Sequence, residues 1–186
     1  MNGISEEIIR GCVANEEKSR KFIYELYYKK MYAICLRYAS DSHEAKDMLH
    51  DGFLKMFDKV KQVDSVNNFE GWIRRLFTNH CIDYLRSAYK KYISYEPDFN
   101  ENFTDEDDSD EESGNVISAD QYDIKELMIA LNQLRPDYRI IINMYAIERF
   151  THQQIAEKLG ISHSTSRSKL LRARKSLKKA LLKDKK

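Results

Sequence analysis

The stretch THQQIAEKLGISHSTSRSKLLRARKSL, residues 151–177, decides how the C-terminal part of this chain folds. Thr151 and Gln154 have the spacing of a capping box, in which each side chain bonds the other residue's backbone N–H where a helix begins. Gly160 can adopt the left-handed conformation that ends a helix in a tight turn. Ser162 can then cap a second helix. The stretch therefore predicts two helices joined by a short turn, a helix-turn-helix.

Apolar residues of the first predicted helix have the spacing of an inward face. Ile155 and Leu159 lie one turn apart on the same side. Ala156 is small, which a close approach of two helices requires, and Ile161 is placed to plug the turn. These four residues are expected to form the interior of the helix pair.

The second predicted helix is strongly basic. Helix pairs of this kind also occur in proteins that never touch DNA, but a row of cations along the second helix suits contact with phosphates and base edges. We therefore predict that this helix binds DNA. Its basic residues are Arg167, Lys169, Arg172, Arg174 and Lys175.

The charge of the whole chain is unevenly distributed. The 186 residues carry 31 Lys and Arg against 30 Asp and Glu, a formal charge of +1. Residues 1–92 have a net charge of +3, residues 93–123 hold 12 acids and no Lys or Arg, and residues 124–186 have a net charge of +10. The near-neutral total is an average over two basic parts and an acidic one, so it does not argue against a nucleic-acid partner.

The acidic stretch has the composition of a disordered tether, because acids, Ser and Asn dominate it and aliphatic residues are few. We predict an N-terminal domain at residues 1–92, an acidic linker at 93–119 and a C-terminal domain at 120–186. A flexible linker of this length allows the two domains to bind separated sites on one partner. The alternative is a plain solvated loop.

Apolar residues recur at spacings of three and four along most of the remaining chain, which predicts an all-α fold of two small helical domains. No run alternates with period two for long enough to form a strand, and 6 Gly and 2 Pro suit helices better than sheets. Asn15 is expected to cap the first long helix, and Asp41 with Glu44 to open the second as a capping box. The expected helices span 15–39, 41–60, 69–90 and 121–134, with another that reaches 149 after an interruption at 135–137.

Composition also argues against several function classes. The longest apolar run, residues 31–36, is too short to cross a membrane, and residues 2–12 show no secretory signal. Three cysteines, Cys12, Cys35 and Cys81, are too few for a disulfide framework and predict free thiols in a reducing cytoplasm. Five scattered histidines and the lack of a glycine-rich phosphate loop give catalysis no support. We expect a cytoplasmic protein without enzymatic activity, cofactor, metal or membrane insertion.

Aromatic, amide and cationic side chains interleave along residues 69–91. Aromatic rings stack on unpaired bases while cations follow phosphates, so this mixture suits single-stranded nucleic acid. Several of these aromatics also fall at core spacing, and composition alone favours packing as the role of most of them. The residues are Phe69, Trp72, Arg74, Arg75, Phe77, Asn79, Tyr84, Arg86, Tyr89, Lys90 and Lys91.

Taken together, these segments resemble one family, the extracytoplasmic-function class of bacterial RNA polymerase sigma factors. DSHEAKDMLHDGFLKMFDKV (41–60) resembles the region that binds core RNA polymerase, FEGWIRRLFTNHCIDYLRS (69–87) resembles the −10 recognition and melting region, and the helix-turn-helix resembles the −35 reader. The resemblance implies sigma region 2 for residues 1–92 and sigma region 4 for residues 120–186. It implies three partners: core polymerase, through its β′ clamp helices and β flap, promoter DNA, and an anti-sigma factor.

The resemblance also implies roles for single residues of the N-terminal domain. The break at 64–68 corresponds to the loop that captures a flipped −10 base, and Phe53 and Phe57 would anchor their helix in the core. Asp83 and Arg86 could equally pair within the fold. The polymerase-facing residues would be Glu44, Asp47, His50 (where the family commonly has Gln) and Asp51; the −10 contacts would be Asn68, Phe69, Trp72, Arg75, Asn79 and Arg86.

In the C-terminal domain, the same resemblance places six residues of the second helix at the −35 element. Arginine can read guanine edges with two hydrogen bonds, which discriminates by about 1–3 kcal/mol, whereas Lys169, Arg174 and Lys175 suit phosphates. Ser166 stands where the family usually buries Val, and a buried hydroxyl needs a partner such as a carbonyl one turn back. The six residues are Arg167, Ser168, Lys169, Leu171, Arg172 and Lys175.

These observations predict a sigma factor that binds core polymerase, recognises −35 and −10 elements and helps to open the duplex. On this hypothesis the acidic linker mimics nucleic acid in the RNA-exit path of the polymerase. One alternative is a DNA-binding regulator with an N-terminal sensing or dimerisation domain, which would bind operator DNA alone and as a dimer. Another is a protein-interaction adaptor, which the basic helix disfavours.

Overall fold

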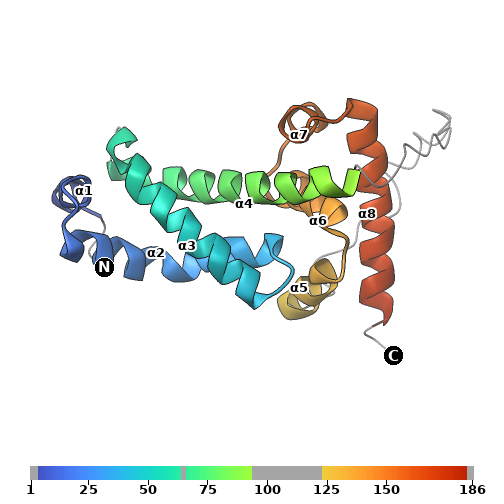
Figure 1. Ribbon diagram of the computed structural model, residues 1–186. Coiled ribbons are helices and arrows are strands. Elements are labelled where there is room, and N and C mark those ends of the chain that lie inside the picture. Colours follow the sequence, from blue (N-terminus) through green and yellow to red (C-terminus); the bar gives the residue numbers. More distant parts are fainter. Residues whose placement is uncertain (1–3, 64–65, 94–122, 184–186) are drawn as a thin grey trace. The chain divides into compact units, whose positions relative to one another are not determined.

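The computed structural model describes residues 4–63, 66–93 and 123–183. Every regular element in these ranges is a helix, which confirms the predicted all-α fold. The chain divides into two compact units, Met1–Arg86 and Ser87–Lys186 (Figure 1). Apart from residue 93, the predicted acidic linker lies outside the described residues, so its boundaries and its proposed mimicry of nucleic acid stay predictions.

The described residues of unit 1 form three α-helices, most of a fourth, and two short 3-10 turns. Helix α2 packs along both α1 and α3 (Figure 1). The core of the unit is filled by aromatic, aliphatic and sulfur-containing side chains such as Tyr38, Phe69, Phe77, Met31 and Met48. The elements are α1 (Glu6–Val13), α2 (Glu17–Tyr38), α3 (Ser42–Lys59), the turns Val60–Gln62 and Val66–Asn68, and α4 (Phe69–Ile93).

Helix α1 was not expected, and its presence changes the role of Asn15. Ser5 caps α1, since its hydroxyl accepts a hydrogen bond from the Ile8 N–H. Asn15 adopts a left-handed conformation (φ 62°) between α1 and α2 instead of capping α2, and its side chain accepts a hydrogen bond from Arg20. The residue before α2 is Glu16, which makes no side-chain capping bond. The predicted Asn15 cap is therefore wrong, because the chain already has to turn between two helices there.

The start of α3 follows the prediction in part. One carboxylate oxygen of Asp41 accepts hydrogen bonds from the N–H groups of His43 (2.7 Å) and Glu44 (2.9 Å). These bonds lower the pKa of Asp41, with the Glu44 N–H as the largest cause. The Glu44 carboxylate bonds to the N–H and hydroxyl of Ser40, one residue before the cap. The helix thus has the expected cap, but the reciprocal bond of the box reaches one residue further back.

Helices α3 and α4 approach so closely that one position on α3 has no room for a side chain. A Cβ atom added to Gly52 would lie 2.4 Å from Cε1 of Phe77. The Phe77 ring is fully buried and meets the Phe53 ring edge-on at 5.1 Å. Glycine at position 52 is therefore required by the packing of a ring directly against the α3 backbone.

A buried histidine joins α3 and α4 beside this contact. His80 Nε2 lies 3.0 Å from the Met48 carbonyl oxygen, and Nδ1 lies 2.8 Å from Lys55 Nζ. Since a carbonyl only accepts and an ammonium only donates, the ring carries its proton on Nε2 and is neutral. Burial lowers the pKa of His80, and the charge of Lys55 lowers it further.

The three cysteines are free and buried. Cys35 on α2 and Cys81 on α4 lie with their sulfur atoms 3.9 Å apart, so these thiols belong to the packing between the two helices. This agrees with the predicted absence of a disulfide framework, because 3.9 Å is far longer than a disulfide bond of about 2.05 Å.

Residues 123–183 of unit 2 form four α-helices and one π-helical turn. The helix that was expected to reach residue 149 ends earlier. After α6 the backbone widens into the π-turn, Arg149 takes a left-handed conformation (φ 61°), and the Phe150 N–H bonds the Met144 carbonyl at 2.9 Å. The elements are α5 (Ile124–Asn132), α6 (Pro136–Ile142), the π-turn Asn143–Ile147, α7 (His152–Leu159) and α8 (His163–Lys183).

The predicted helix-turn-helix is present as α7 and α8. Thr151 and Gln154 form the reciprocal capping box, and Gly160 has the expected left-handed conformation with φ 69°. The Ser162 hydroxyl accepts a hydrogen bond from the Thr165 N–H at 3.0 Å and thereby caps α8. The predicted inward residues of α7, Ile155, Ala156 and Leu159, are buried.

Enlarging Gly52 should destabilise the N-terminal unit, because the added methyl group meets the fixed Phe77 ring. We expect Gly52→Ala to lower the free energy of unfolding by about 1–3 kcal/mol, the usual cost of overpacking a core. Gly71→Ala is the matched control, since nothing lies within 4 Å of its Cβ position on α4. It should stabilise α4 by up to about 1 kcal/mol. Urea unfolding checks both, and equal effects of the two variants would contradict the packing argument.

His80 should make the N-terminal unit less stable as the pH falls below about 6.5, where an unfolded histidine takes up a proton. Because its pKa is lowered, the folded chain binds this proton only at lower pH than the unfolded chain does. Protonation therefore stabilises the unfolded state relative to the folded state. The slope from His80 is at most about 1.4 kcal/mol per pH unit. His80→Gln should flatten the loss of stability between about pH 7.5 and 5.5. Urea unfolding at a series of pH values measures this slope, and an equally steep loss of stability in His80→Gln would contradict the prediction.

Candidate nucleic-acid interface

One side of α8 is buried in unit 2 and the other side carries the predicted DNA contacts. Leu170, Ala173, Leu177 and Leu181 face the core. The predicted −35 residues occupy the remaining surface of the helix. Arg167, Ser168, Lys169, Leu171 and Arg172 are partly exposed, and Lys175 is exposed.

Ser166 sets the rotation of α8. It is fully buried, and its hydroxyl lies 3.0 Å from Nδ1 of His152 on α7. The expected partner was a backbone carbonyl one turn back, so the imidazole corrects this detail of the prediction. The His152 ring in turn stacks on Tyr145, with centroids 4.8 Å apart. Because Ser166 points into the core, the residue that follows it, Arg167, lies toward the surface.

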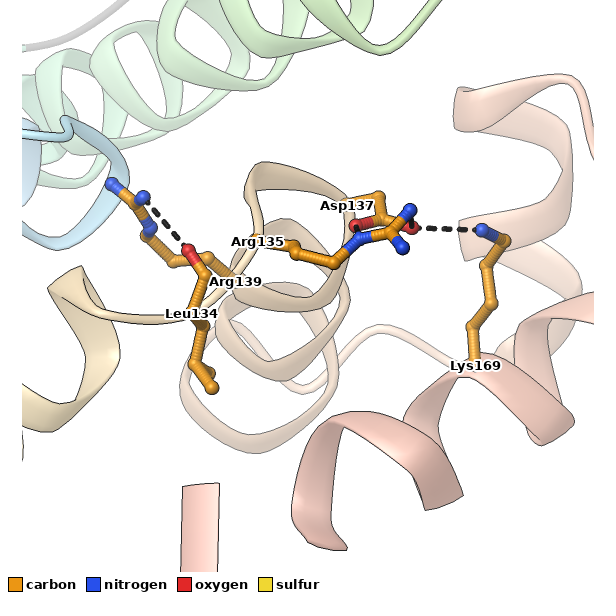
Figure 2. Close-up of polar contacts among 5 residues, drawn as sticks. All are labelled: Leu134, Arg135, Asp137, Arg139 and Lys169. Atoms are coloured by element: carbon orange, nitrogen blue, oxygen red, sulfur yellow. Dashed lines mark hydrogen bonds and ion pairs between the residues drawn. The ribbon is translucent and has the colours of Figure 1, made fainter. Parts of the chain in front are cut away.

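A buried carboxylate on α6 holds α8 one turn further along (Figure 2). Asp137 is only 4% exposed. Its Oδ1 accepts a hydrogen bond from Arg135 Nε at 3.1 Å, and its Oδ2 accepts one from Arg135 Nη2 at 3.3 Å. Lys169 Nζ lies 2.9 Å from the same Oδ2, and the lysine side chain is 20% exposed. The structure thus places Lys169 in an ion pair within the unit, where the sequence predicted a phosphate contact.

Arg139, also on α6, holds the connection between α5 and α6 (Figure 2). It is 2% exposed, and its Nη2 donates hydrogen bonds to the carbonyl oxygens of Leu134 (3.1 Å) and Asn132 (3.4 Å). Sequence reasoning missed both Asp137 and Arg139 as organising residues. The available signal was a pair of opposite charges flanked by Pro136 and the apolar run 140–142, a setting in which burial demands partners.

The predicted polymerase-facing residues lie together on α3. Asp47, His50 and Asp51 are exposed, and Glu44 is half-buried. Tyr84 of α4 belongs to the same surface, although the sequence did not assign it there. Burial raises the pKa of Tyr84, and the charge of Glu44, a hydrogen bond to that carboxylate and the charges of Asp47 and Asp51 raise it further. The result is an acidic face along α3, bordered by a phenol from α4.

The predicted −10 residues lie in different environments. Asn68, Arg75 and Arg86 are exposed, whereas Trp72 and Asn79 are half-buried. Phe69 is 1% exposed and packs between the rings of Tyr27 (5.5 Å) and Trp72 (5.6 Å), so it supports the start of α4 from the core. Of the predicted base-capturing loop, residues 66–68 form a 3-10 turn and residues 64–65 lie outside the described part.

Two further observations bear on other functions. In the ranges that the structure describes, no three His, Cys, Asp or Glu side chains gather in a way that could hold a metal ion. Over the same ranges, none of the helices combines the length and the apolar character that a membrane crossing demands.

Two family descriptions match the chain, one for each unit. Residues 23–91 match Sigma-70 region 2, and residues 124–177 match Sigma-70 region 4. Together the two matches cover about two thirds of the chain.

Similar proteins carry related names. The chain is 27% identical over 154 residues to the ECF RNA polymerase sigma factor SigE of Mycolicibacterium smegmatis, covering 83% of this chain and 58% of that protein. It is 26% identical to SigM of Bacillus subtilis, covering 84% and 91%, and 27% identical to SigW of the same species, covering 86% and 87%. Among solved structures it is similar to the sigma factor RpoE in complex with the anti-sigma factor NepR from Bartonella quintana, with 21% identity, coverage of 87% and 95%, and a TM-score of 0.49.

Both units match Sigma-70 regions in the order expected from the sequence, and the relatives that span the chain are extracytoplasmic-function sigma factors. The chain therefore belongs to the extracytoplasmic-function class of the sigma-70 family and serves promoter-directed transcription initiation by RNA polymerase.

Proposed function

We propose that this sigma factor reads the −35 element with α8 and the −10 element with the start of α4, while the acidic face of α3 binds core polymerase. The observation that carries the −35 assignment is the fixed rotation of α8. Ser166 is buried against His152, so Arg167 and Arg172 project from the surface of the unit. Partly exposed arginines on the second helix of a helix-turn-helix can reach base edges in the major groove.

The roles within α8 divide by exposure and chemistry. Arg167 and Arg172 are suited to guanine edges, and Leu171 and Ser168 to the apolar and polar base edges beside them. Lys175 is exposed and suited to a phosphate. In this arrangement the arginines supply sequence discrimination, and the lysine supplies affinity.

In unit 1 the −10 role rests on the residues around the start of α4. The exposed Asn68, Arg75 and Arg86 and the half-buried Trp72 and Asn79 provide amide, cationic and aromatic groups. Such groups hydrogen-bond, neutralise and stack on unpaired nucleotides. Phe69 takes a supporting role beneath Trp72.

The acidic face is the proposed docking surface for the β′ clamp helices of the polymerase. Its three acids lie on one side of α3, at positions 44, 47 and 51, so they meet a partner together. Control by an anti-sigma factor and contact of unit 2 with the β flap are further proposals that follow from membership of the family. We also propose that the protein acts in the cytoplasm and performs no bond chemistry of its own.

Run-off transcription with purified core RNA polymerase tests the proposed function. Template promoters are selected from a random library by the reconstituted holoenzyme, and transcripts from them should require this chain. A regulator that binds operators by itself should instead bind one duplex sequence specifically without core polymerase. Stimulation that does not depend on promoter sequence would refute the proposal.

Removal of one base-reading arginine should reduce promoter binding. Arg172→Ala should weaken binding of the holoenzyme to its selected promoter by about 1–3 kcal/mol, roughly 5- to 150-fold, and relax the sequence preference at one −35 position. Lys179→Ala removes a charge from an exposed position two turns further along α8 and is the matched control. Binding titrations on single-base −35 variants measure both effects. An equal loss from the two variants would mean that Arg172 acts through charge alone.

Removal of acids from the face of α3 should weaken binding to core polymerase. We expect Asp47→Ala to lower affinity by up to about fivefold, the usual range for one exposed charge, and more strongly at low salt. Lys46→Ala changes a neighbouring exposed residue on another side of α3 and should leave affinity unchanged. Fluorescence titration of labelled chain with core polymerase measures both. Unchanged affinity of Asp47→Ala and Asp51→Ala together would exclude this face as the docking surface.

A further inference from the structure

The ion pair between Asp137 and Lys169 removes one cation from the surface that α8 offers to DNA. The Asp137 carboxylate is 4% exposed and has three hydrogen bonds, two from Arg135 and one from Lys169. Figure 2 shows the Lys169 side chain reaching from α8 toward this carboxylate, with Arg135 on the other side. The charge of a nearly buried carboxylate is thereby shared between two cations.

For Lys169 to bind a phosphate, it would have to leave Asp137. That step would leave the buried carboxylate with Arg135 alone, and uncovering a buried charge costs more free energy than one solvent-exposed ionic contact returns. Lys169 therefore differs from its neighbour Lys175, which is exposed. The two lysines have the same charge but unequal freedom to meet DNA.

The same ion pair adds a second attachment for α8. Ser166 is held by His152 of α7 at 3.0 Å, and Lys169, one turn later, is held by Asp137 of α6 at 2.9 Å. Two attachments on successive turns, each to a different helix, oppose rotation of α8 about its own axis. Arg167, which lies between them, is placed by both.

We propose that Asp137 is a positioning residue for DNA recognition, which fixes the rotation of α8 and withholds Lys169 from the phosphate backbone. Phosphate contacts raise affinity for every sequence equally, while base contacts distinguish sequences. Withholding one lysine therefore lowers non-specific binding and leaves the arginines to decide where the protein binds. This inference rests on the proposed role of α8 in reading the −35 element.

The salt dependence of binding to random-sequence duplex DNA tests this proposal. The full-length chain and its variants are titrated against a labelled 20-base-pair duplex (roughly two helical turns) at a series of salt concentrations. Each phosphate contact contributes about 0.9 to the slope of log affinity against log salt. Lys169→Gln should leave the slope unchanged, whereas Lys175→Gln should reduce it by about 0.9. Asp137→Asn should increase it by about 0.9, because it releases Lys169, and the double variant Asp137→Asn/Lys169→Gln should return it to the wild-type value.

Each outcome distinguishes the inference from the function on which it rests. A reduced slope for Lys169→Gln alone, or an unchanged slope for Asp137→Asn, would overturn the withholding of Lys169 while the effect of Lys175→Gln still supports DNA binding by α8. If neither Lys175→Gln nor any other variant changes the slope, the proposed DNA-reading face fails and the inference fails with it. A purely structural role of Asp137 would lower the melting temperature without changing the slope. If Asp137→Asn does not fold, the Lys169→Gln result decides, and Lys169→Arg, which keeps a cation at Asp137, should behave as the wild type.

Discussion

A buried hydroxyl needs a hydrogen-bond partner within the protein, and in unit 2 this constraint determines which side of α8 forms the proposed DNA-binding surface. Ser166 is completely buried and meets His152, which in turn stacks on Tyr145. The hydrogen bond fixes the rotation of α8 about its own axis against α7. The ion pair with Asp137 holds α8 in the same orientation against α6. The outward direction of the arginines is thus a consequence of the polar interior of the unit.

In unit 1 the orientation of two helices, α3 and α4, depends on a side chain packed directly against backbone. The Phe77 ring lies against Gly52, and the neutral His80 connects the Met48 carbonyl to Lys55 beside it. The contact of Phe77 with Gly52 fixes the distance between α3 and α4, and the bonds of His80 limit sliding of one helix along the other. The acidic face of α3 and the proposed −10 residues of α4 are therefore parts of one packed body, and a change in the interior affects both.

Local signals in the sequence predicted the parts that depend on neighbouring residues. The capping box at Thr151, the left-handed Gly160 and the Ser162 cap are all present, because each is determined within about four residues. Contacts between distant segments were not predictable in this way. The partner of Ser166 and the pairing of Lys169 with Asp137, 32 residues away, depend on how α6, α7 and α8 pack. Helix α1 was missed although Ser5 and the spacing of Ile8, Ile9 and Cys12 carried a usable signal.

The absence of a side chain at Gly52 also has a mechanical consequence. A side chain between two helices can change rotamer and so accommodate a small displacement. The Phe77 ring lies directly on the α3 backbone at Gly52, where no side chain can adjust in this way. In the proposed complex with core polymerase bound to α3, any tilt imposed on α3 is transmitted to α4. The orientation of the proposed −10 surface of α4 then follows the orientation of α3, because the contact between the two helices deforms little.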